Sequence, residues 1–509
     1  MYVTPSYLTL FCSVTDIVSV QLHTFVFSTL SHFSSLFTTF LVRAVILYSP
    51  LYHSLYRSRF LRTTMHRLQG LVLFVLSALF RAVVAAPVVI VSPGNAGDII
   101  VTKENTVNAT TPAPSNSTIQ ENIFSSGGKL PLALVNNFAG GAINAYVTGL
   151  DAHNRLVMLK PDGTFYYPIA NRAIATPQAI TVNCAIPLGA KGSTKQITIP
   201  GYISAARVWF AEGHLEFFTI YSTASGGSAL VEPSSVNPSD PSAGVNWGFV
   251  ELTNTEKGGL YANISYVDFV GLPLGMTLNS ADGPTQTAEG LKAGSVASIC
   301  ADLKAQGKKD GQPWGDLCMV NSAGQPLRVI APSDYVASNP SAFSNYWTDY
   351  IEQVWSHYTT NNLMVNTQAA VGHVSCKVNN NQIKCNGDNR GYNKPNALDI
   401  FGCNNGPFGI IGSDNSVHRA VVPRLCAAFN RGTLLKQGGN ITPSLAATSY
   451  YTTMPSNWYS KFVHAHESDG KGYAFPYDDV NPSVGVDQAG VVADAAPTLL
   501  TITVGGPMR

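Results

Sequence analysis

The chain has 509 residues, 45% of them hydrophobic and only 12% charged, and its formal net charge is +1. The first 85 residues hold six Arg and a single acid, so the rest of the chain carries 25 bases against 29 acids. This weak acidity argues against a nucleic-acid-binding protein, which needs a basic stripe. With 44 Gly and 30 Pro, the composition indicates a β-rich globular protein large enough for two domains.

A secretory signal peptide is predicted at residues 65–85. Met65-His66-Arg67 provides a basic start, Leu71–Phe80 an apolar core, and the small residues up to Ala85 a cleavage site. The core is shorter than the roughly 20 residues that a membrane span needs. We therefore expect a secreted, extracellular protein without membrane contact after cleavage, and association with a cell wall is left open.

Residues 1–64 precede this signal and are rich in Phe, Leu, Ser and Thr, with no clear periodicity. The preferred interpretation is an over-extended gene model whose start is Met65. The rival is a signal-anchor near Phe25–Tyr48. If residues 1–64 are retained in the mature protein, a wall-anchored structural protein is a third possibility. Protein N-terminal sequencing distinguishes these interpretations.

The segment 86–127 is predicted to be a Ser/Thr/Pro-rich linker. Its part Glu104–Gln120 is too polar to pack and is expected to be glycosylated. The sequons of the chain, which fit an exported glycoprotein, are Asn108, Asn116, Asn263 and Asn440. Asn263 lies inside a predicted strand, which disfavours its modification.

A β domain is predicted over residues 128–278. Short apolar runs separated by turn residues predict strands at 132–135, 143–148, 156–160, 165–167, 180–184 and 197–199. Arg207–Ile220 is predicted to be a hairpin around Glu212-Gly213. Closely spaced strands of this kind are typical of a β-sandwich or β-barrel.

The stretch Trp247–Met276 holds two carboxylates inside apolar strands. A turn at residues 256–259 makes it a hairpin, with Glu251 in the first arm and Asp268 in the second. Acids at such positions are costly unless they are paired, solvated in a cleft or used in chemistry. A structural role, in which backbone groups or Arg satisfy both acids, is the alternative that the residues alone leave open.

The register of this hairpin decides whether the acids can act together. A four-residue turn between Thr255 and Leu260 pairs Glu251 with Ile264, which puts Glu251 and Asp268 on one face. Their backbones are then roughly 13 Å apart at about 3.3 Å per residue. Leaning side chains or a bulge could bring the carboxyl groups to about 6.5–9.5 Å, the spacing of an inverting glycosidase. An odd-length turn would put the acids on opposite faces.

A mixed α/β segment is predicted at residues 279–435, followed by a return to the β domain at 436–509. Three helices are expected there: one that contains Val296–Leu303, one that Asn339 caps, and one over about residues 422–431. The buried stripe of the second helix is Phe343, Trp347, Tyr350, Ile351, Val354 and Tyr358. Strands are expected at 363–365, 373–378, 382–385 and 501–504. A groove between two such lobes is where a ligand would bind.

Cysteine usage agrees with secretion. Apart from Cys12 and Cys184, the cysteines fall between residues 300 and 426. Short-loop disulfides 300–318, 376–385 and 403–426 are a pairing that the spacing allows but does not prove. Cys184 would then be a buried free thiol. No cysteine spacing matches a zinc site.

Five stretches, within roughly residues 128–505, carry a resemblance to a known family. In chain order they are NPSDPSAGVNWGFVELTNT, YANISYVDFVGLPLG, LDIFGCNNGPF, PRLCAAFNRGTLL and GYAFPYDDV. Together they resemble glycoside hydrolase family 64, the thaumatin-like endo-β-1,3-glucanases that release laminaripentaose. The resemblance implies a mainly β fold with an α/β insertion, in which a thaumatin-like β-barrel or sandwich lobe and a mixed α/β lobe flank a wide, acidic groove.

The resemblance also implies roles for single residues. The family's acid/base pair lies in the motifs that read here as VELTN and VDFVG, which makes Glu251 the general acid and Asp268 the general base. Thr253 and Asn254, beside the acid, are implied to contact sugar. Further groove candidates are Asp240, Asp478 and Asp479, which would raise the pKa of the acid by repulsion. The candidates for stacking on sugar rings are Trp247, Tyr261, Tyr473 and Tyr477. Asp240 and Asp478-Asp479 could instead belong to ordinary turns.

The resulting hypothesis is a secreted, monomeric endo-β-1,3-glucanase that acts by inversion on laminarin, curdlan or fungal wall glucan, without metal or cofactor. The rival is a non-catalytic, thaumatin-like glucan-binding or defence protein, which a reducing-sugar assay would separate. A Ser-His-Asp triad has no signature in this chain. His464, His466, Glu467 and Asp469 imitate a metal cluster, but a surface turn is the preferred interpretation.

Overall fold

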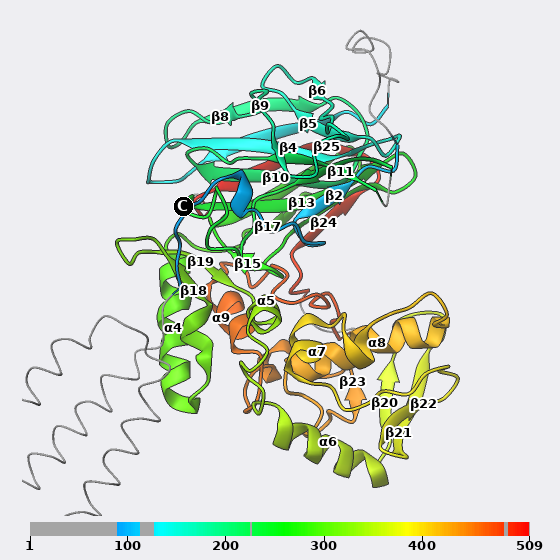
Figure 1. Cartoon of the computed structure of the whole chain (residues 1–509). Coiled ribbons are helices and arrows are strands. Elements are labelled where there is room, and N and C mark those ends of the chain that lie inside the picture. The colour runs from blue at the N-terminus through cyan, green and yellow to red at the C-terminus, as the bar shows by residue number, and fades with distance from the viewer. Residues whose placement is uncertain (1–88, 112–126, 224–225, 483–486, 508–509) are drawn as a thin grey trace, which may run out of the picture. The chain divides into compact units, whose positions relative to one another are not determined.

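The computed structural model describes residues 89–111, 127–223, 226–482 and 487–507, and the fold is mainly β (Figure 1). The predicted extension 1–64 and signal 65–85 lie outside the described residues. The described part contains five sheets and the helices α4 to α9. None of these helices is long and apolar enough to cross a membrane.

An eight-stranded antiparallel sheet, the central sheet, carries both arms of the predicted hairpin up to Ile264. Its order is β24-β14-β13-β10-β4-β5-β6, with β8 beside β4. The strands are β4 (Ile143–Asp151), β5 (Leu156–Leu159), β6 (Phe165–Tyr166), β8 (Ile186–Pro187), β10 (Ile203–Glu212), β13 (Trp247–Thr255), β14 (Gly259–Ile264) and β24 (Val491–Asp494). Because side chains alternate along a strand, Val208, Phe210, Val250 and Leu252 share one face and enter the main core.

A five-stranded sheet, the back sheet, packs on that face. Its order is β17-β16-β25-β3-β9. The strands are β3 (Leu130–Asn136), β9 (Thr194–Ile199), β16 (Leu274–Ser280), β17 (Gln286–Ala288) and β25 (Pro497–Val504). Leu130, Leu132 and Leu134 of β3 belong to the same core as Val208. The strand β25 is antiparallel to β16 and parallel to β3, so it lies inside the sheet and not at its edge.

The other face of the central sheet carries aromatic rings. Trp209, Trp247 and Phe249 pack there with Phe269, and the Trp247 and Phe269 ring centroids are 4.5 Å apart. The sheet β2-β12-β11-β7 contributes Leu230 to this second core. Its strands are β2 (Thr106–Asn108), β7 (Gln178–Ala179), β11 (Phe218–Ser222) and β12 (Gly227–Val231).

A further four-stranded sheet of the described residues has the order β1-β18-β19-β15. Its strands are β1 (Val89–Ile90), β15 (Phe269–Val270), β18 (Cys318–Val320) and β19 (Pro326–Ile330).

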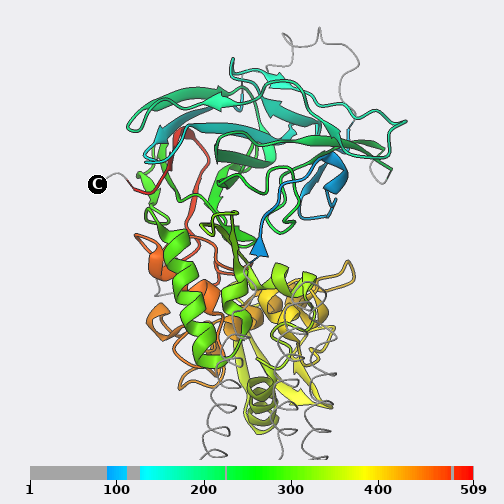
Figure 2. The same ribbon diagram turned by 60° about the vertical axis from the view of Figure 1, so that its left-hand side comes forward.

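Part of the predicted linker is folded. β1 pairs with β18, β2 pairs with β12, and the 3-10 helix η1 (Ala96–Asp98) lies between them in the chain. Figure 2 shows this N-terminal segment in blue beside the green strands. The prediction that Glu104–Gln120 is too polar to pack is therefore wrong for residues 104–111, because backbone pairing holds them in place. Residues 112–120 lie outside the described residues.

Two strand predictions are wrong. The hairpin Arg207–Ile220 does not form, because β10 pairs with β4 and β13 while β11 pairs with β12 and β7. Both edges of β10 are thus occupied by other strands. Residues 180–184 form no strand, and the local pairings are made by β7 and β8 on either side.

The α/β lobe contains the sheet β22-β21-β20-β23 and the helices α4 to α9. The strands are β20 (Leu363–Asn366), β21 (His373–Asn379), β22 (Gln382–Cys385) and β23 (Ile441–Thr442). The helices are α4 (Ser295–Asp310), α5 (Pro332–Ser338), α6 (Thr348–Thr360), α7 (Ala397–Gly402), α8 (Ser416–Asn430) and α9 (Trp458–His466). Shorter 3-10 turns are η3 (Pro313–Leu317), η4 (Gly406–Phe408) and η5 (Ala447–Ser449).

The predicted helices exist, and two of them start elsewhere. Asn339 is the C-cap of α5 rather than the N-cap of the next helix, and its side chain donates to the Tyr335 carbonyl. Phe343 has a φ of 55°, which breaks the helical path, so α6 begins only at Thr348. The predicted aromatic stripe is nevertheless buried from Phe343 to Tyr358. α8 begins ahead of its predicted start, at Ser416.

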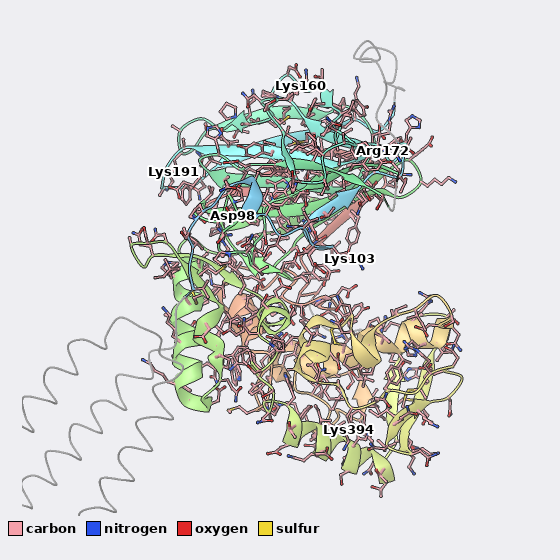
Figure 3. All side chains as sticks on the ribbon, viewed as in Figure 1. Asp98, Lys103, Lys160, Arg172, Lys191 and Lys394 are labelled. Atoms are coloured by element: carbon pink, nitrogen blue, oxygen red, sulfur yellow. A yellow bond between two sulfur atoms is a disulfide. The ribbon has the colours of Figure 1, made fainter. Side chains whose placement is uncertain are left out.

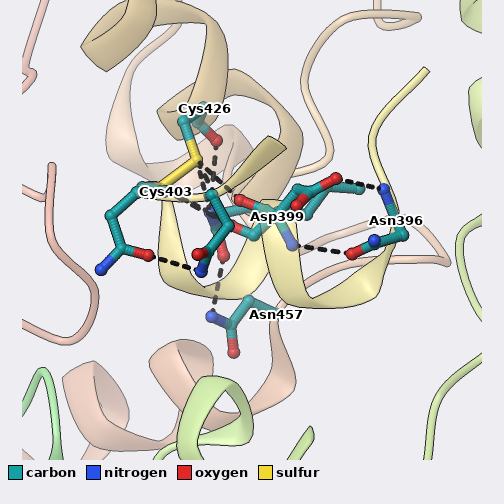
Figure 4. The surroundings of a disulfide bond; sticks show 9 residues. Asn396, Asp399, Cys403, Cys426 and Asn457 are labelled. Carbon is teal, nitrogen blue, oxygen red and sulfur yellow. Dashed lines mark hydrogen bonds between the residues drawn. A yellow bond between two sulfur atoms is a disulfide. The ribbon is translucent and has the colours of Figure 1, made fainter. Parts of the chain in front are cut away.

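The three disulfides are those that the spacing allowed. Cys300–Cys318, Cys376–Cys385 and Cys403–Cys426 are bonded, and Cys184 is a buried free thiol. Figure 4 shows the third disulfide, which ties α8 to the end of α7. Asn396 and Asp399 form a capping box at the start of α7 in the same view.

The expected lobe boundaries shift in the structure. The boundary at 278 falls inside β16, and β17 still pairs with it, so the β lobe extends to Ala288. The expected return at 436 is too early, because β23 pairs with β20 of the α/β lobe. The chain rejoins the central sheet at β24.

Candidate active site

The candidate site begins as a polar row across four neighbouring strands of the central sheet. Arg207 of β10 is paired with Thr148 of β4 on one side and with Glu251 of β13 on the other. Glu251 is in turn paired with Asn263 of β14. Paired residues project to the same face, so this row continues the face that Trp209 and Phe249 cover with aromatic rings.

The register of the β13–β14 hairpin differs by one residue from the predicted one. The turn has three residues, with Thr255 opposite Gly259, so Glu251 faces Asn263 and not Ile264. An odd-length turn was expected to separate the acids. It does not, because β14 ends at Ile264 and Asp268 lies in a bend before β15, which belongs to another sheet. The rule that every second side chain points to the same face holds only within one strand, so it does not apply to Asp268.

Local contacts fix the chain between β14 and β15. Ser265 forms a parallel bridge with Tyr473, and the Tyr266 N–H donates to the Tyr473 carbonyl at 2.7 Å. The Asp268 carbonyl then accepts from the Ala331 N–H at 2.8 Å. The segment that follows the α/β lobe thus holds one end of this bend, and the start of α5 holds the other.

Arg207 brings the two acids together. Its terminal nitrogen Nη2 lies 3.3 Å from Glu251 Oε1 and 4.0 Å from Asp268 Oδ2. The two oxygens are therefore at most 7.3 Å apart, the sum of these distances. The side chains of Glu251 and Asp268 are 36% and 33% exposed, whereas Arg207 is 18% exposed. Both carboxyl groups can thus be reached from outside, with the guanidinium beneath them.

Arg207 is itself held from the protein interior. Its Nη1 donates to Glu232 Oε2 at 2.6 Å, and Glu232 is buried with its other oxygen bound to the Thr148 hydroxyl at 2.8 Å. The Trp209 indole N–H donates to the same hydroxyl. The guanidinium also lies 4.4 Å from the Phe249 ring centroid, a cation–π contact. These contacts leave the guanidinium little freedom.

The pKa values of this group follow from burial and from the neighbouring charges. Burial lowers the pKa of Arg207, but Glu232, Glu251 and Asp268 together raise it above its ordinary value. Burial raises the pKa of Glu232, against the effect of Arg207. Burial also raises the pKa of Asp268 to about 6; Arg207 lowers it and Glu251 raises it further. Asp268 is therefore a stronger base than an ordinary aspartate and is still largely ionised at neutral pH.

Asp334 is a third acid at this place. It lies in the first turn of α5, shortly after Ala331, which binds the Asp268 carbonyl. Burial raises the pKa of Asp334 to about 8, and repulsion from Asp268 and Glu104 contributes. Asp334 is therefore more readily protonated than an ordinary aspartate, which weakens its repulsion of Asp268.

Three of the other predicted site residues, Thr253, Tyr477 and Asp479, are at least partly exposed. Thr253 lies on the face of Glu251 and is paired with Tyr261, whose hydroxyl is 3.1 Å from that of Tyr473. Asp479 is exposed, and Tyr477 is half-buried. Burial raises the pKa of Asp479.

Three other predicted site residues are buried and bind groups of the protein. Asn254 donates to the Gly128 carbonyl at 3.0 Å, and Asp240 accepts from the Ser234 and Ser242 N–H groups. Asp478 is fully buried against Arg431 at 2.9 Å and His464 at 2.8 Å. These side chains offer a sugar no accessible surface, so Asp240, Asn254 and Asp478 have the contacts of structural residues.

The histidines that imitate a metal cluster also have other partners. His464 bridges Glu467 and Asp478 inside the protein, and His466 Nε2 lies 2.7 Å from Asp302. In the described residues, no group of three or more His, Cys, Asp or Glu is arranged to hold a metal ion. The preferred surface turn is wrong for His464 and His466, which lie in α9, and the His464 side chain is only 8% exposed.

Sequence reasoning missed Arg207, Glu232 and Asp334. The signal for the first two was present, because each is a charged residue in an apolar run, RVWFA and ALVEP. The same argument that singled out Glu251 and Asp268 applies to them. Asp334 carries no such signal, since an acid in the first turn of a helix is common for local electrostatic reasons.

Two accessible carboxyl groups, both beside the same guanidinium nitrogen in a mainly β fold, are the parts of an acid/base hydrolase of the glycosidase class. A family model described as beta-1,3-glucanase, that of glycoside hydrolase family 64, matches residues 128–504. The chain belongs to this family.

Relatives agree with this assignment. Glucan endo-1,3-beta-glucosidases of Arthrobacter sp. (strain YCWD3) and Cellulosimicrobium cellulans are 26% and 25% identical to it over 282 residues, 54% of this chain and 48% of each relative. The chain thus spans about half the length of these curated relatives. A laminaripentaose-producing beta-1,3-glucanase solved with laminaritetraose has 27% identity and a TM-score of 0.64, over 74% of this chain and 99% of that one. A beta-1,3-glucanase domain from Clostridium beijerinckii has a similar fold, with a TM-score of 0.56 and 24% identity, over 74% of this chain and 98% of that one.

The buried Glu232–Arg207 pair makes a prediction about stability. Replacing Glu232 by Ala leaves the inner side of the guanidinium without its carboxylate, so the free energy of unfolding should fall by about 3–5 kcal/mol. The matched control is Glu352→Ala, which removes a 60% exposed carboxylate paired with Lys394. That change should cost about 0–1 kcal/mol. Urea unfolding followed by Trp fluorescence measures both, and equal losses would contradict the structural role of Glu232.

Proposed function

We propose that this protein is a secreted endo-β-1,3-glucanase that hydrolyses β-1,3-glucan with inversion, with Glu251 as general acid and Asp268 as general base. The observation that carries the proposal is the accessible carboxyl pair, each within 4.0 Å of the same Arg207 nitrogen. The names of the relatives and the bound laminaritetraose of the similar structure point to the same substrate class. The three disulfides fit an extracellular protein.

The proposed reaction uses one proton transfer at each carboxyl group. Glu251, protonated, gives its proton to the glycosidic oxygen as the bond from that oxygen to the anomeric carbon breaks. Asp268, ionised, takes a proton from a water molecule that attacks the anomeric carbon from the opposite side. One water is consumed, and the new reducing end has the opposite anomeric configuration. The upper limit of 7.3 Å on the oxygen separation allows the lower part of the inverting range of about 6.5–9.5 Å as well as the retaining distance of about 5–5.5 Å, so the stereochemistry of the product decides between the two.

Arg207 has a positioning role in this proposal. It holds both carboxyl groups through one nitrogen, and its charge favours the ionised form of the base. Burial works in the other direction and raises the pKa of Asp268 to about 6. The result is a base that is ionised at neutral pH yet accepts a proton more readily than an ordinary aspartate.

The sugar contacts are proposed for the accessible residues alone. Thr253 and Tyr261 share the face of Glu251, and Asp479 and Tyr477 lie on the segment that Tyr473 ties to the end of β14. Hydroxyl groups of a neutral sugar can donate to the Asp479 carboxylate, and aromatic faces suit the apolar face of a glucose ring. We propose a monomer that needs no cofactor and has glucan as its partner.

Removal of either acid should abolish hydrolysis while the fold persists. Glu251→Gln and Asp268→Asn keep the size of each side chain but remove the proton donor and the base, so kcat should fall by about 10²–10⁴-fold. The control is Glu256→Gln, an exposed acid in the β13–β14 turn. Release of reducing sugar from laminarin, with circular dichroism to check folding, measures the effect. Normal turnover in either acid variant would refute the assignment of that residue.

The stereochemistry of the first product distinguishes inversion from retention. Hydrolysis of a β-linked glucan by direct attack of water should release the α-anomer first, which then mutarotates. Proton NMR of the anomeric signals during the first minutes of laminarin hydrolysis follows this. Initial release of the β-anomer would mean a covalent intermediate and would exclude the proposed roles. Binding of curdlan without any release of reducing sugar would instead favour the non-catalytic glucan-binding protein.

A further inference from the structure

The folded N-terminal segment, residues 89–111, lies outside the family-matched region 128–504. We call it the strap. Its β1 joins the sheet β1-β18-β19-β15 by pairing with β18. Its β2 joins the sheet β2-β12-β11-β7 by pairing with β12. Between these strands, Ser92 and Gly94 donate to the Pro238 and Ser239 carbonyls. The strap is therefore bound along its length to the lobe that carries the candidate site.

The two ends of the strap reach the two halves of the site. β1 belongs to the sheet whose other edge is β15, the strand that directly follows Asp268. β2 pairs with β12, which ends just before Glu232, the partner of Arg207. The Glu232 N–H donates to the Asn105 carbonyl of the strap at 2.9 Å. The strap thus connects the sheet next to Asp268 with the backbone of Glu232, the residue that holds Arg207 in place.

A tight turn next to this contact projects two charged residues. The Thr102 N–H donates to Asn105 Oδ1 at 2.7 Å, and the Asn105 N–H donates to Thr102 Oγ1 at 3.3 Å. Asn105 is only 5% exposed and also donates to the Ile100 carbonyl, so the turn is fixed from within. Lys103 and Glu104, at the tip, are exposed. Figure 3 shows Lys103 at the lower edge of the β lobe, below the strands.

The tip of this turn lies next to the charged row of the site. Glu104 directly precedes Asn105, whose carbonyl accepts from the Glu232 N–H at 2.9 Å, and Glu232 holds Arg207 beside the two acids. In agreement with this geometry, the charge of Glu104 raises the pKa of both Asp268 and Asp334. Ile100 and Val101, just before the turn, are 58% and 42% exposed. An exposed apolar pair beside a carboxylate matches a sugar, which presents both an apolar ring face and hydroxyl donors.

We propose that the strap forms an additional wall of the substrate site, and that Glu104 accepts a hydrogen bond from a hydroxyl of the glucose unit bound beside Asp268. Ile100 and Val101 would cover the apolar face of an adjoining unit. This inference rests on the proposed function, because it assigns a further contact to the same glucan chain.

The test compares Glu104→Ala with Glu256→Ala in the full chain, using laminarihexaose. Both residues are exposed acids in turns of the same lobe with a neighbouring Lys, so Glu256 is a matched control. Loss of a hydrogen bond to a charged group should raise KM about tenfold in Glu104→Ala, with kcat changed by less than about twofold. Glu256→Ala should leave both constants unchanged.

The pH dependence of kcat/KM provides a second test, because a purely structural role of Glu104 would not shift it. The groups that face Asp268 are Arg207, Glu251, Glu104, Asp334 and Tyr459. The base must be ionised, so kcat/KM of the unaltered chain should fall as the pH drops through about 6. Glu104→Gln removes a negative charge, which lowers the pKa of Asp268, so this acid limb should move to lower pH. Glu256→Gln should not shift it.

The outcomes separate this inference from the proposed function. An active unaltered chain whose KM and acid limb are the same in the Glu104 variants would overturn the strap contact and leave the proposed function intact. Equal rises of KM in Glu104→Ala and Glu256→Ala would also overturn it. No hydrolysis by the unaltered chain would overturn both.

Discussion

The position of one buried cation, Arg207, determines the arrangement of the candidate site. A guanidinium removed from water is stable only if anions surround it, and Arg207 has Glu232 on its inner side and Glu251 and Asp268 on its outer side. The inner carboxylate is buried and fixed by Thr148, so it sets where the cation lies. The two outer carboxylates then converge on the cation, one from β13 and the other from the bend before β15. Without the positive charge, three acids would repel one another at close range.

Signals that are local in sequence predicted much of the fold. The three disulfides close short loops, and the stripe from Phe343 to Tyr358 is buried. The caps were less predictable, because Asn339 can end one helix as well as start another, and the positive φ of Phe343 has no sequence signature. The hairpin around Glu212 failed for a non-local reason. β10 is flanked by strands that are distant in the chain, and local spacing contains no information about them.

The same distinction applies to the candidate site. Glu251 and Asp268 were found because a charged side chain in an apolar strand is costly unless it has a partner or a function. The shared face that was expected for them assumed that one continuous strand runs from the turn to Asp268. The chain instead leaves the central sheet after Ile264, and Asp268 reaches Arg207 from the bend before β15. The burial of Asn254 and Asp478 was equally hidden, because their partners Gly128 and Arg431 are identified only by the tertiary structure. Asp240 is different, because its partners Ser234 and Ser242 are close in the chain and agree with the turn that the sequence left open.

The place of β25 in the back sheet has a consequence for biosynthesis. This strand is the last of the chain, yet it fills the position between β16 and β3, and its parallel pairing with β3 joins residues more than 350 positions apart. While the chain is being made, the back sheet has a vacant position until residues 497–504 emerge, whereas the disulfide-bonded α/β lobe is complete earlier. Such long-range pairing forms slowly. The lobe that carries the acids should therefore close only after β25 has been made, later than the disulfide-bonded α/β lobe.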